Sequence, residues 1–166
     1  MVSLKNKQNI YVAKKVIDLE IEALKRLKNK INSSFNDAVD AIVNCKSKVV
    51  LSGVGKSGLI ASKISATLSK KDVLILISYS GKTNELKNII QYANRNKILL
   101  IGIISKKDSL LYKASDIKLL TPEVNEAGGI VPTSSTTTQL ALGDALAISS
   151  MKIKKFSNLD FKKVHP

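Results

Sequence analysis

Apolar and polar residues follow two different patterns along this chain of 166 residues. From Gln8 to Asn29, apolar residues recur at the spacing of an amphipathic helix. Ser33 or Ser34 supplies the N-cap of a second helix, because the apolar residues that follow keep the same spacing. We therefore expect two helices before the first strand. Their buried faces are predicted to hold Val12, Val16, Leu19, Ala23, Leu24 and Leu27 in the first helix and Phe35, Ala38, Val39, Ile42 and Val43 in the second.

After Lys48, short runs of consecutive apolar residues alternate with helical patterns. Such continuous runs are typical of parallel strands that are buried on both faces. Strands that alternate with helices predict a parallel sheet covered on both sides, which is a three-layer α/β/α domain. The predicted strands are 48–52, 73–77, 98–104 and 117–120, and the predicted helices are 59–69, 84–93, 109–114 and 134–152.

Length and composition favour one domain over 1–166, because domains average roughly 150 residues. Cys45 is the only cysteine and His165 the only histidine. An internal disulfide and a closed zinc cluster of His and Cys are therefore excluded, and we expect no metal. The longest apolar runs fall far short of the ~20 residues of a membrane helix, and the N-terminus lacks a signal-peptide core. We expect a cytoplasmic protein without a membrane partner.

The net charge of +14 invites the hypothesis of a nucleic-acid partner. However, Arg26 and Arg95 are the only arginines, whereas direct readout of bases favours arginine. The lysines are also spread along the chain rather than gathered in one basic arm. We therefore expect a solvated, lysine-rich surface and no nucleic-acid partner.

Three loops rich in glycine and hydroxyl residues follow strands or precede a helix, where open α/β sheets bind ligands. The first, Gly53–Gly58, has the G-x-G-x-x-G spacing of dinucleotide-binding proteins. The acid that this motif requires after the next strand is missing, since Asp72 precedes that strand. Val50 stands where the first glycine of a P-loop belongs. A tight turn without a ligand is the alternative.

The second loop runs from Ser78 to Glu85, and the third from Pro132 to Thr138. Hydroxyls and free N–H groups at a helix start bind phosphate, whereas ordinary capping needs only one such residue. Glu85 either complements the helix dipole or acts as a catalytic carboxylate. Glu126 precedes the third loop, and a lone glutamate in a loop is usually solvated. The residues by themselves predict a small phosphorylated ligand without an adenosine group.

These loops, in this order, resemble the sugar isomerase (SIS) domain. Ser78-Tyr-Ser-Gly-Lys-Thr-Asn-Glu85 is similar to the S-x-S-G-x-T-x-E phosphosugar loop of that family. Pro132-Thr-Ser-Ser-Thr-Thr137, Leu142-Gly-Asp144 and His165-Pro166 resemble the arabinose 5-phosphate isomerases within it. The resemblance covers nearly the whole chain. It implies a single SIS domain with a flavodoxin-like or Rossmann-like sheet. The sequence stops where many relatives continue into a pair of CBS domains, so we expect no CBS domains here.

The resemblance implies an aldose–ketose isomerase that interconverts D-ribulose 5-phosphate and D-arabinose 5-phosphate through a cis-enediol. The product serves 3-deoxy-D-manno-octulosonate and lipopolysaccharide synthesis. It further implies no organic cofactor and a homotetramer with shared active sites. The residues that resemble catalytic ones are Lys56, Glu85, Glu126 and His165, and the predicted substrate contacts are Gly53, Ser57, Ser78, Ser80, Thr83, Thr133, Ser134, Ser135 and Thr136.

Each of these residues has an expected role. The hydroxyls of Ser78, Ser80, Thr83 and the cluster 134–136 hold the phosphate, and Lys56 steadies the sugar oxygens. Glu126 or Glu85 is the base, and His165 opens the sugar ring or relays protons.

Two departures and two alternatives accompany the resemblance. Between Leu68 and Asp72 the family carries a further strand and a loop with another histidine, so we expect a smaller sheet. Gly128-Gly129 stands where the family usually has Cys-Pro. One alternative is another SIS isomerase, such as a 6-phospho-3-hexuloisomerase. The other is an inactive, regulatory module that only binds a sugar phosphate.

Overall fold

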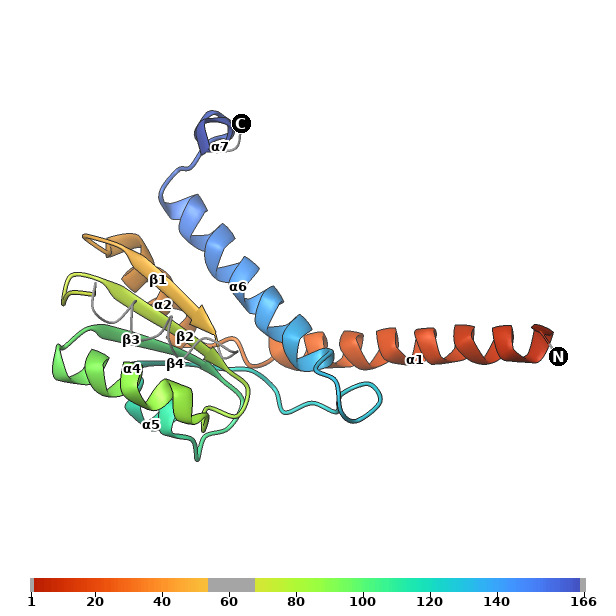
Figure 1. The fold of residues 1–166 in the computed structure, drawn as a ribbon. Coiled ribbons are helices and arrows are strands. Elements are labelled where there is room, and N and C mark those ends of the chain that lie inside the picture. The colour runs from red at the N-terminus through yellow and green to blue at the C-terminus, as the bar shows by residue number, and fades with distance from the viewer. Residues whose placement is uncertain (1, 54–67, 165–166) are drawn as a thin grey trace.

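The structure is a computed structural model that describes residues 2–53 and 68–164. In these residues, four parallel strands form a sheet in the order β1-β2-β3-β4, which is the middle layer of the molecule (Figure 1). Each strand bound lies within one residue of the prediction, so the predicted parallel sheet is confirmed. The strands are β1 (Val49–Gly53), β2 (Val73–Ser78), β3 (Leu99–Ile104) and β4 (Ile117–Leu120).

Helices cover both faces of the sheet (Figure 1). Consecutive parallel strands are joined by right-handed crossovers, so the connecting helices α4 (Asn84–Arg95) and α5 (Leu110–Ala114) lie on one face. The opposite face carries α1 (Val2–Lys28), α2 (Ser33–Asn44) and α6 (Ser134–Ile153). The three-layer architecture and the two N-terminal helices are thereby confirmed. The predicted helix 59–69 lies largely outside the described residues.

The core consists of two clusters, one on each face of the sheet. Successive strand residues point to opposite faces, so Leu74 and Leu76 pack with Ile89 of α4. The alternate residues Val73 and Ile75 pack with helices α2 and α6 on the other face. Since both faces are buried, both sets of positions must be apolar, which explains the continuous apolar runs.

The first helix is longer than predicted and only partly buried. Ala23 and Leu27 lie in the core as expected, but Val12 is 52% exposed. The N-terminal half of α1 extends beyond the sheet (Figure 1), so none of the described elements covers its predicted buried face there. No helix in residues 2–53 and 68–164 is both long and apolar enough to cross a membrane.

The structure differs from the prediction at the start of α2 and after the end of α6. The N-cap of α2 is Asn32, so the prediction of Ser33 or Ser34 was wrong by one or two residues. Asn32 has an extended backbone and its Oδ1 accepts a hydrogen bond from Ser34 N at 3.0 Å, a role that asparagine fills as well as serine. A short helix that we did not predict, α7 (Asn158–Val164), follows α6.

A buried carboxylate joins the starts of β1 and β2. Asp72 is 2% exposed, and its carboxylate accepts hydrogen bonds from Lys48 N at 3.1 Å and from Ser69 N at 2.5 Å. Burial raises the pKa of Asp72, but hydrogen bonds from Ser47, Ser69 and Lys48 outweigh it and hold the pKa far below its usual value. Asp72 therefore acts as a structural residue of the sheet.

We expect Asp72→Asn to lower the free energy of unfolding by about 1–2 kcal/mol, because the amide replaces a charged acceptor of several hydrogen bonds. A carboxylate with a lowered pKa stabilises the fold above its unfolded pKa of about 3.9. The difference between the proteins therefore shrinks as the pH falls below that value. Urea denaturation at several pH values measures it. The control is Asp116→Asn, since exposed Asp116 accepts one N–H at 2.8 Å, from Leu100. Equal losses in both variants would contradict the assignment.

Candidate functional site

A cavity of about 480 Å³ lies at the carboxyl ends of the strands, where the fold class places ligands. The end of β1, the loop after β2 and the first turns of α6 form its wall. Two of the three predicted loops therefore face the same space, together with Gly53 from the start of the first. The lining residues are Gly53, Ile77, Ser78, Tyr79, Ser80, Thr83, Pro132, Ser135, Thr136 and Gln139.

The loop after β2 folds tightly against α5. Ser78 Oγ accepts a hydrogen bond from Gly81 N at 3.0 Å, and Leu111 N donates to Gly81 O at 3.1 Å. Gly81 has a φ of +61°, and a Cβ there would lie 2.4 Å from Ser109 Oγ. Only glycine fits both the backbone conformation and the space. The hydroxyls of the loop are held at the cavity by this packing.

Capping does not account for the hydroxyls of this loop. Thr83 is the N-cap residue of α4, but its side chain makes no cap hydrogen bond. Ser80 is exposed, and its Oγ accepts one long hydrogen bond, at 3.4 Å, from Lys82 N. Both side chains line the cavity. Their hydroxyls are therefore available to a ligand.

The first turn of α6 is capped by a distant residue, Glu126. The N-cap residue is Thr133, whose own side chain makes no cap bond. One carboxylate oxygen of Glu126 accepts hydrogen bonds from Thr133 N at 2.8 Å, Thr133 Oγ1 at 3.2 Å and Ser135 N at 3.3 Å. The lone loop glutamate is thus not simply solvated. It lies at a helix start that borders the cavity.

Hydrogen bonds stabilise the charged form of Glu126. Its partial burial raises its pKa, but hydrogen bonds from Ser135 and Thr133 outweigh that effect and hold the pKa below its usual value. Ser134 is fully buried beside these donors, and its hydroxyl has no hydrogen-bond partner among the described residues. The turn therefore already binds one anion, the Glu126 carboxylate, and contains a buried hydroxyl without a hydrogen-bond partner among the described residues.

The other predicted catalytic residues are placed differently. Glu85 is exposed in the first turn of α4 and is not among the described residues that line the cavity. There its charge complements the helix dipole. Lys56, Ser57 and His165 lie outside the described residues, so their predicted roles stay predictions.

Sequence reasoning missed two polar residues at the cavity, Tyr79 and Gln139. The Tyr79 hydroxyl accepts a hydrogen bond from Val124 N at 3.0 Å and donates to Val124 O at 3.4 Å. It thereby ties the loop after β2 to the segment that leads to Glu126. Gln139 follows Ser135 by four positions on α6, and this helical spacing places it on the same face. The four-residue spacing in the sequence could have identified Gln139 as a cavity residue, whereas no sequence pattern indicated the contact of Tyr79 with Val124.

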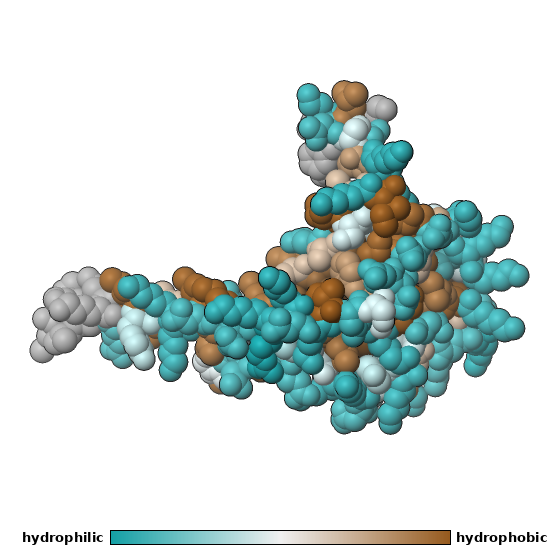
Figure 2. Space-filling view, turned by 180° about the vertical axis from the view of Figure 1, so that it is seen from behind, coloured by the Kyte–Doolittle hydropathy of each residue, from teal (hydrophilic) through white to brown (hydrophobic). Residues whose placement is uncertain are grey.

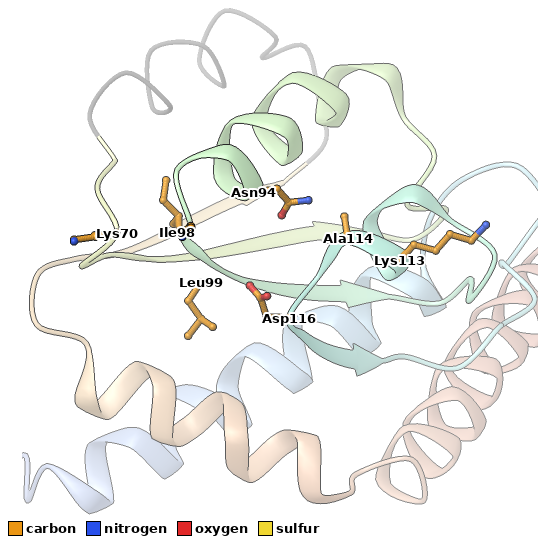
Figure 3. Close-up of a pocket in the computed structure, with 8 residues that line it drawn as sticks. Lys70, Asn94, Ile98, Leu99, Lys113, Ala114 and Asp116 are labelled. Atoms are coloured by element: carbon orange, nitrogen blue, oxygen red, sulfur yellow. The ribbon is translucent and has the colours of Figure 1, made fainter.

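A second hollow, of about 510 Å³, lies at the opposite end of the sheet. Lys70, Lys97 and Lys113 are among its lining residues. In Figure 3 the amino groups of Lys70 and Lys113 point away from its centre. The amino groups of these two lysines therefore do not converge on one bound anion in this hollow. Among the described residues, no group of three His, Cys, Asp or Glu side chains is arranged to hold a metal ion.

Comparison with known proteins identifies the family. The sequence profile of the SIS domain matches residues 63–149, which is more than half of the chain. The chain therefore belongs to the SIS domain family, as the loops predicted. A protein of Escherichia coli CFT073 solved in complex with arabinose 5-phosphate superposes with a TM-score of 0.84 at 31% identity, covering 97% of this chain and 99% of that one.

Two curated relatives are similar in sequence over most of this chain. The arabinose 5-phosphate isomerase of Yersinia pestis is 38% identical over 92% of this chain and 54% of its own length. The arabinose 5-phosphate isomerase of Francisella tularensis is 38% identical over 89% and 54%. The chain thus spans about half the length of these relatives. The first alignment has 178 positions, more than this whole chain, so that relative carries residues within the matched region that this chain lacks.

We expect Gly81→Ala to destabilise the protein by about 1–3 kcal/mol more than Gly128→Ala, because only the former forces a Cβ into occupied space. Both glycines have positive φ, but a Cβ at Gly128 meets no described atom within 4 Å. The two variants therefore share the backbone strain and differ in the contact with Ser109. Urea denaturation of both proteins measures the difference. Equal losses would show that the loop does not pack as described.

Proposed function

We propose that this protein is an aldose–ketose isomerase that interconverts D-ribulose 5-phosphate and D-arabinose 5-phosphate. One observation carries the proposal: two hydroxyl-rich loops line one cavity, and a carboxylate, Glu126, is hydrogen-bonded to the helix start that borders it. The names of the two isomerase relatives and the E. coli complex with arabinose 5-phosphate support the choice of substrate. The product would serve 3-deoxy-D-manno-octulosonate and lipopolysaccharide synthesis. We further propose that 1–166 is a single SIS domain that works without an organic cofactor.

The hydroxyl-rich wall binds the phosphate. Ser78, Ser80 and Thr83 approach from the loop after β2, and Ser135 and Thr136 approach from α6. The N-terminus of α6 adds backbone N–H groups, two of which bond Glu126 in this structure, and the positive end of a helix dipole, which favour an oxyanion. The remaining predicted contacts in the described residues, Gly53, Thr133 and Ser134, belong to the same loops, and the contact of Ser57 stays a prediction from the resemblance.

The carbonyl moves between two carbons by proton transfer. A base removes a proton from C1 of the ketose, the C1–H electron pair forms the C1=C2 bond, and the carbonyl electrons move to O2. The base then returns the proton to C2, while a proton passes from O1 to O2 and C1 becomes the aldehyde carbon. We assign the base to Glu126, because its carboxylate is hydrogen-bonded to the helix start that borders the cavity, whereas Glu85 is exposed in the first turn of α4. Lys56 steadies the charged oxygens of the enediolate.

We assign the relay of the hydroxyl proton to His165 and propose that it acts in another copy of the chain. The cavity lies at the N-terminus of α6, and α7 follows the far end of this helix (Figure 1). Twenty residues of helix span about 30 Å at 1.5 Å per residue. His165 comes directly after α7. The proposed active sites are therefore shared between subunits.

Exposed apolar residues provide the surface for this association. Figure 2 shows brown, hydrophobic side chains along α1 and beside α6. Monomeric proteins rarely expose large continuous apolar patches, and we propose that copies of the chain cover them in a homotetramer. The exposed residues on these two helices are Ile10, Tyr11, Val12, Ile17 and Ile21 on α1 and Leu140, Ile148 and Ile153 on α6.

The activity is tested with D-ribulose 5-phosphate in a coupled assay, on protein whose intact mass has been measured. We expect turnover by the wild type and a loss of about 10²–10⁴-fold in kcat for Glu126→Gln, because the amide accepts no proton from carbon. His165→Asn is expected to lose activity as well. The matched control is Glu123→Gln, since Glu123 is exposed and pairs with Lys106 away from the cavity. Near-full activity in Glu126→Gln and His165→Asn would contradict the assignment, and substrate binding without wild-type turnover would favour an inactive binding module.

The association is tested by light scattering coupled to size exclusion. We expect the wild type to have four times the 18.0 kDa mass of one chain. Ile17→Glu is expected to yield a smaller species, because a charge in an apolar interface is costly. Lys14→Glu, at a polar exposed position of the same helix, serves as the control. A monomeric wild type, or equal masses in all three proteins, would contradict the proposal.

A further inference from the structure

Glu126 occupies N–H groups that an anionic ligand would use. Its carboxylate oxygen accepts hydrogen bonds from Thr133 N at 2.8 Å and Ser135 N at 3.3 Å. These groups begin a helix of 20 residues, whose N-terminus carries a partial positive charge. Helix N-termini of this kind are sites for phosphate and carboxylate. In this structure the anion is a side chain of the protein itself.

The same turn faces the cavity from the other side. Ser135 and Thr136 line the cavity, whereas Glu126 reaches Ser135 N from the loop 125–132 and is not a lining residue. The buried Ser134 hydroxyl has no partner among the described residues, although a carboxylate lies at the neighbouring donors. A phosphate bound to this turn would take donors from Glu126 and repel its charge.

We propose that the phosphate of the substrate displaces Glu126 from the first turn of α6 and that this exchange releases Glu126 to act as the base. The proposal rests on the function proposed above and adds a regulatory step to it. Before substrate binds, hydrogen bonds keep Glu126 a weak base. Their loss and the nearby phosphate charge both raise its pKa on release.

The loop that carries Glu126 is fixed at Val124 and has open space, among the described residues, around the glycines that follow Glu126. Val124 is fixed by two hydrogen bonds to the Tyr79 hydroxyl. Beyond Glu126, Gly128 and Gly129 have φ values of +73° and +76°, with no described atom within 4 Å of a Cβ at either position. The contacts that hold this part of the loop are hydrogen bonds, from Ala127 N to Thr133 Oγ1 at 3.0 Å and from Gly129 N to Glu126 O at 3.1 Å, rather than packed side chains at these glycines. Tyr79 keeps the base close to the cavity when it leaves the helix.

The test measures binding of inorganic phosphate, which has no sugar contacts, by calorimetry. We expect Glu126→Gln to bind phosphate about tenfold more tightly than the wild type. The reason is that the neutral amide competes less well than a carboxylate for the same N–H groups. Glu123→Gln, which changes the same charge on an exposed surface position, is expected to match the wild type. Equal or weaker binding by Glu126→Gln, or no binding by any of the proteins, would overturn the proposal.

A second measurement uses the unmodified protein, so that it does not depend on the folding of a variant. During a phosphate titration followed by NMR, the Ser135 amide and the Glu126 carboxyl carbon are expected to shift with one midpoint. A shift of the Ser135 amide with a static Glu126 carboxyl signal would overturn the exchange. If the wild type isomerises its substrate but these results fail, only the exchange is wrong. If they hold and no isomerisation occurs, the proposed function is wrong and the exchange describes a binding site.

Discussion

The edge of the sheet that carries the cavity depends on one constraint, the unpaired N–H groups at helix starts. Every α-helix begins with donors that no carbonyl of the same helix can satisfy. A parallel sheet with crossover helices gathers those starts at one edge, here those of α4 and α6. Neither Thr83 nor Thr133 caps its own helix with its side chain. The rest of the fold holds two incompletely capped helices beside one cavity.

Carboxylates satisfy backbone donors at both ends of the sheet, and burial decides what each does. Asp72 lies in the core, and its hydrogen bonds join two strands permanently. Glu126 makes similar bonds at the edge of a cavity, on a loop with two glycines of positive φ. The same interaction is therefore structural in one place and, on our proposal, exchangeable in the other. Removing it costs stability at Asp72, whereas at Glu126 it frees donors for a ligand.

The sheet was predictable because its signal is local. Continuous apolar runs identified all four described strands, and β4 has the predicted bounds. Contacts between distant segments were not predictable: Tyr79 and Val124 are 45 residues apart, and no periodic pattern connects them. The sequence alone indicated that Glu126 is solvated, because its hydrogen-bond partners lie seven and nine positions further on and no local pattern connects them. Only the resemblance to the SIS family pointed to this residue.

Helical periodicity also predicted a buried face for α1 that the described part of a single chain does not cover. The prediction is confirmed for Ala23 and Leu27, which are buried, but not for Val12, which is exposed in the described part of the chain. Helical periodicity predicts which face of a helix is buried. It does not predict whether the surface that covers this face belongs to the same chain or to another copy. On the proposed assignment, the covering copies also bring His165 to a neighbouring cavity. Under this proposal, association and catalysis depend on each other, because the phosphate-binding wall and the base of one cavity would come from one chain and the proton relay from another.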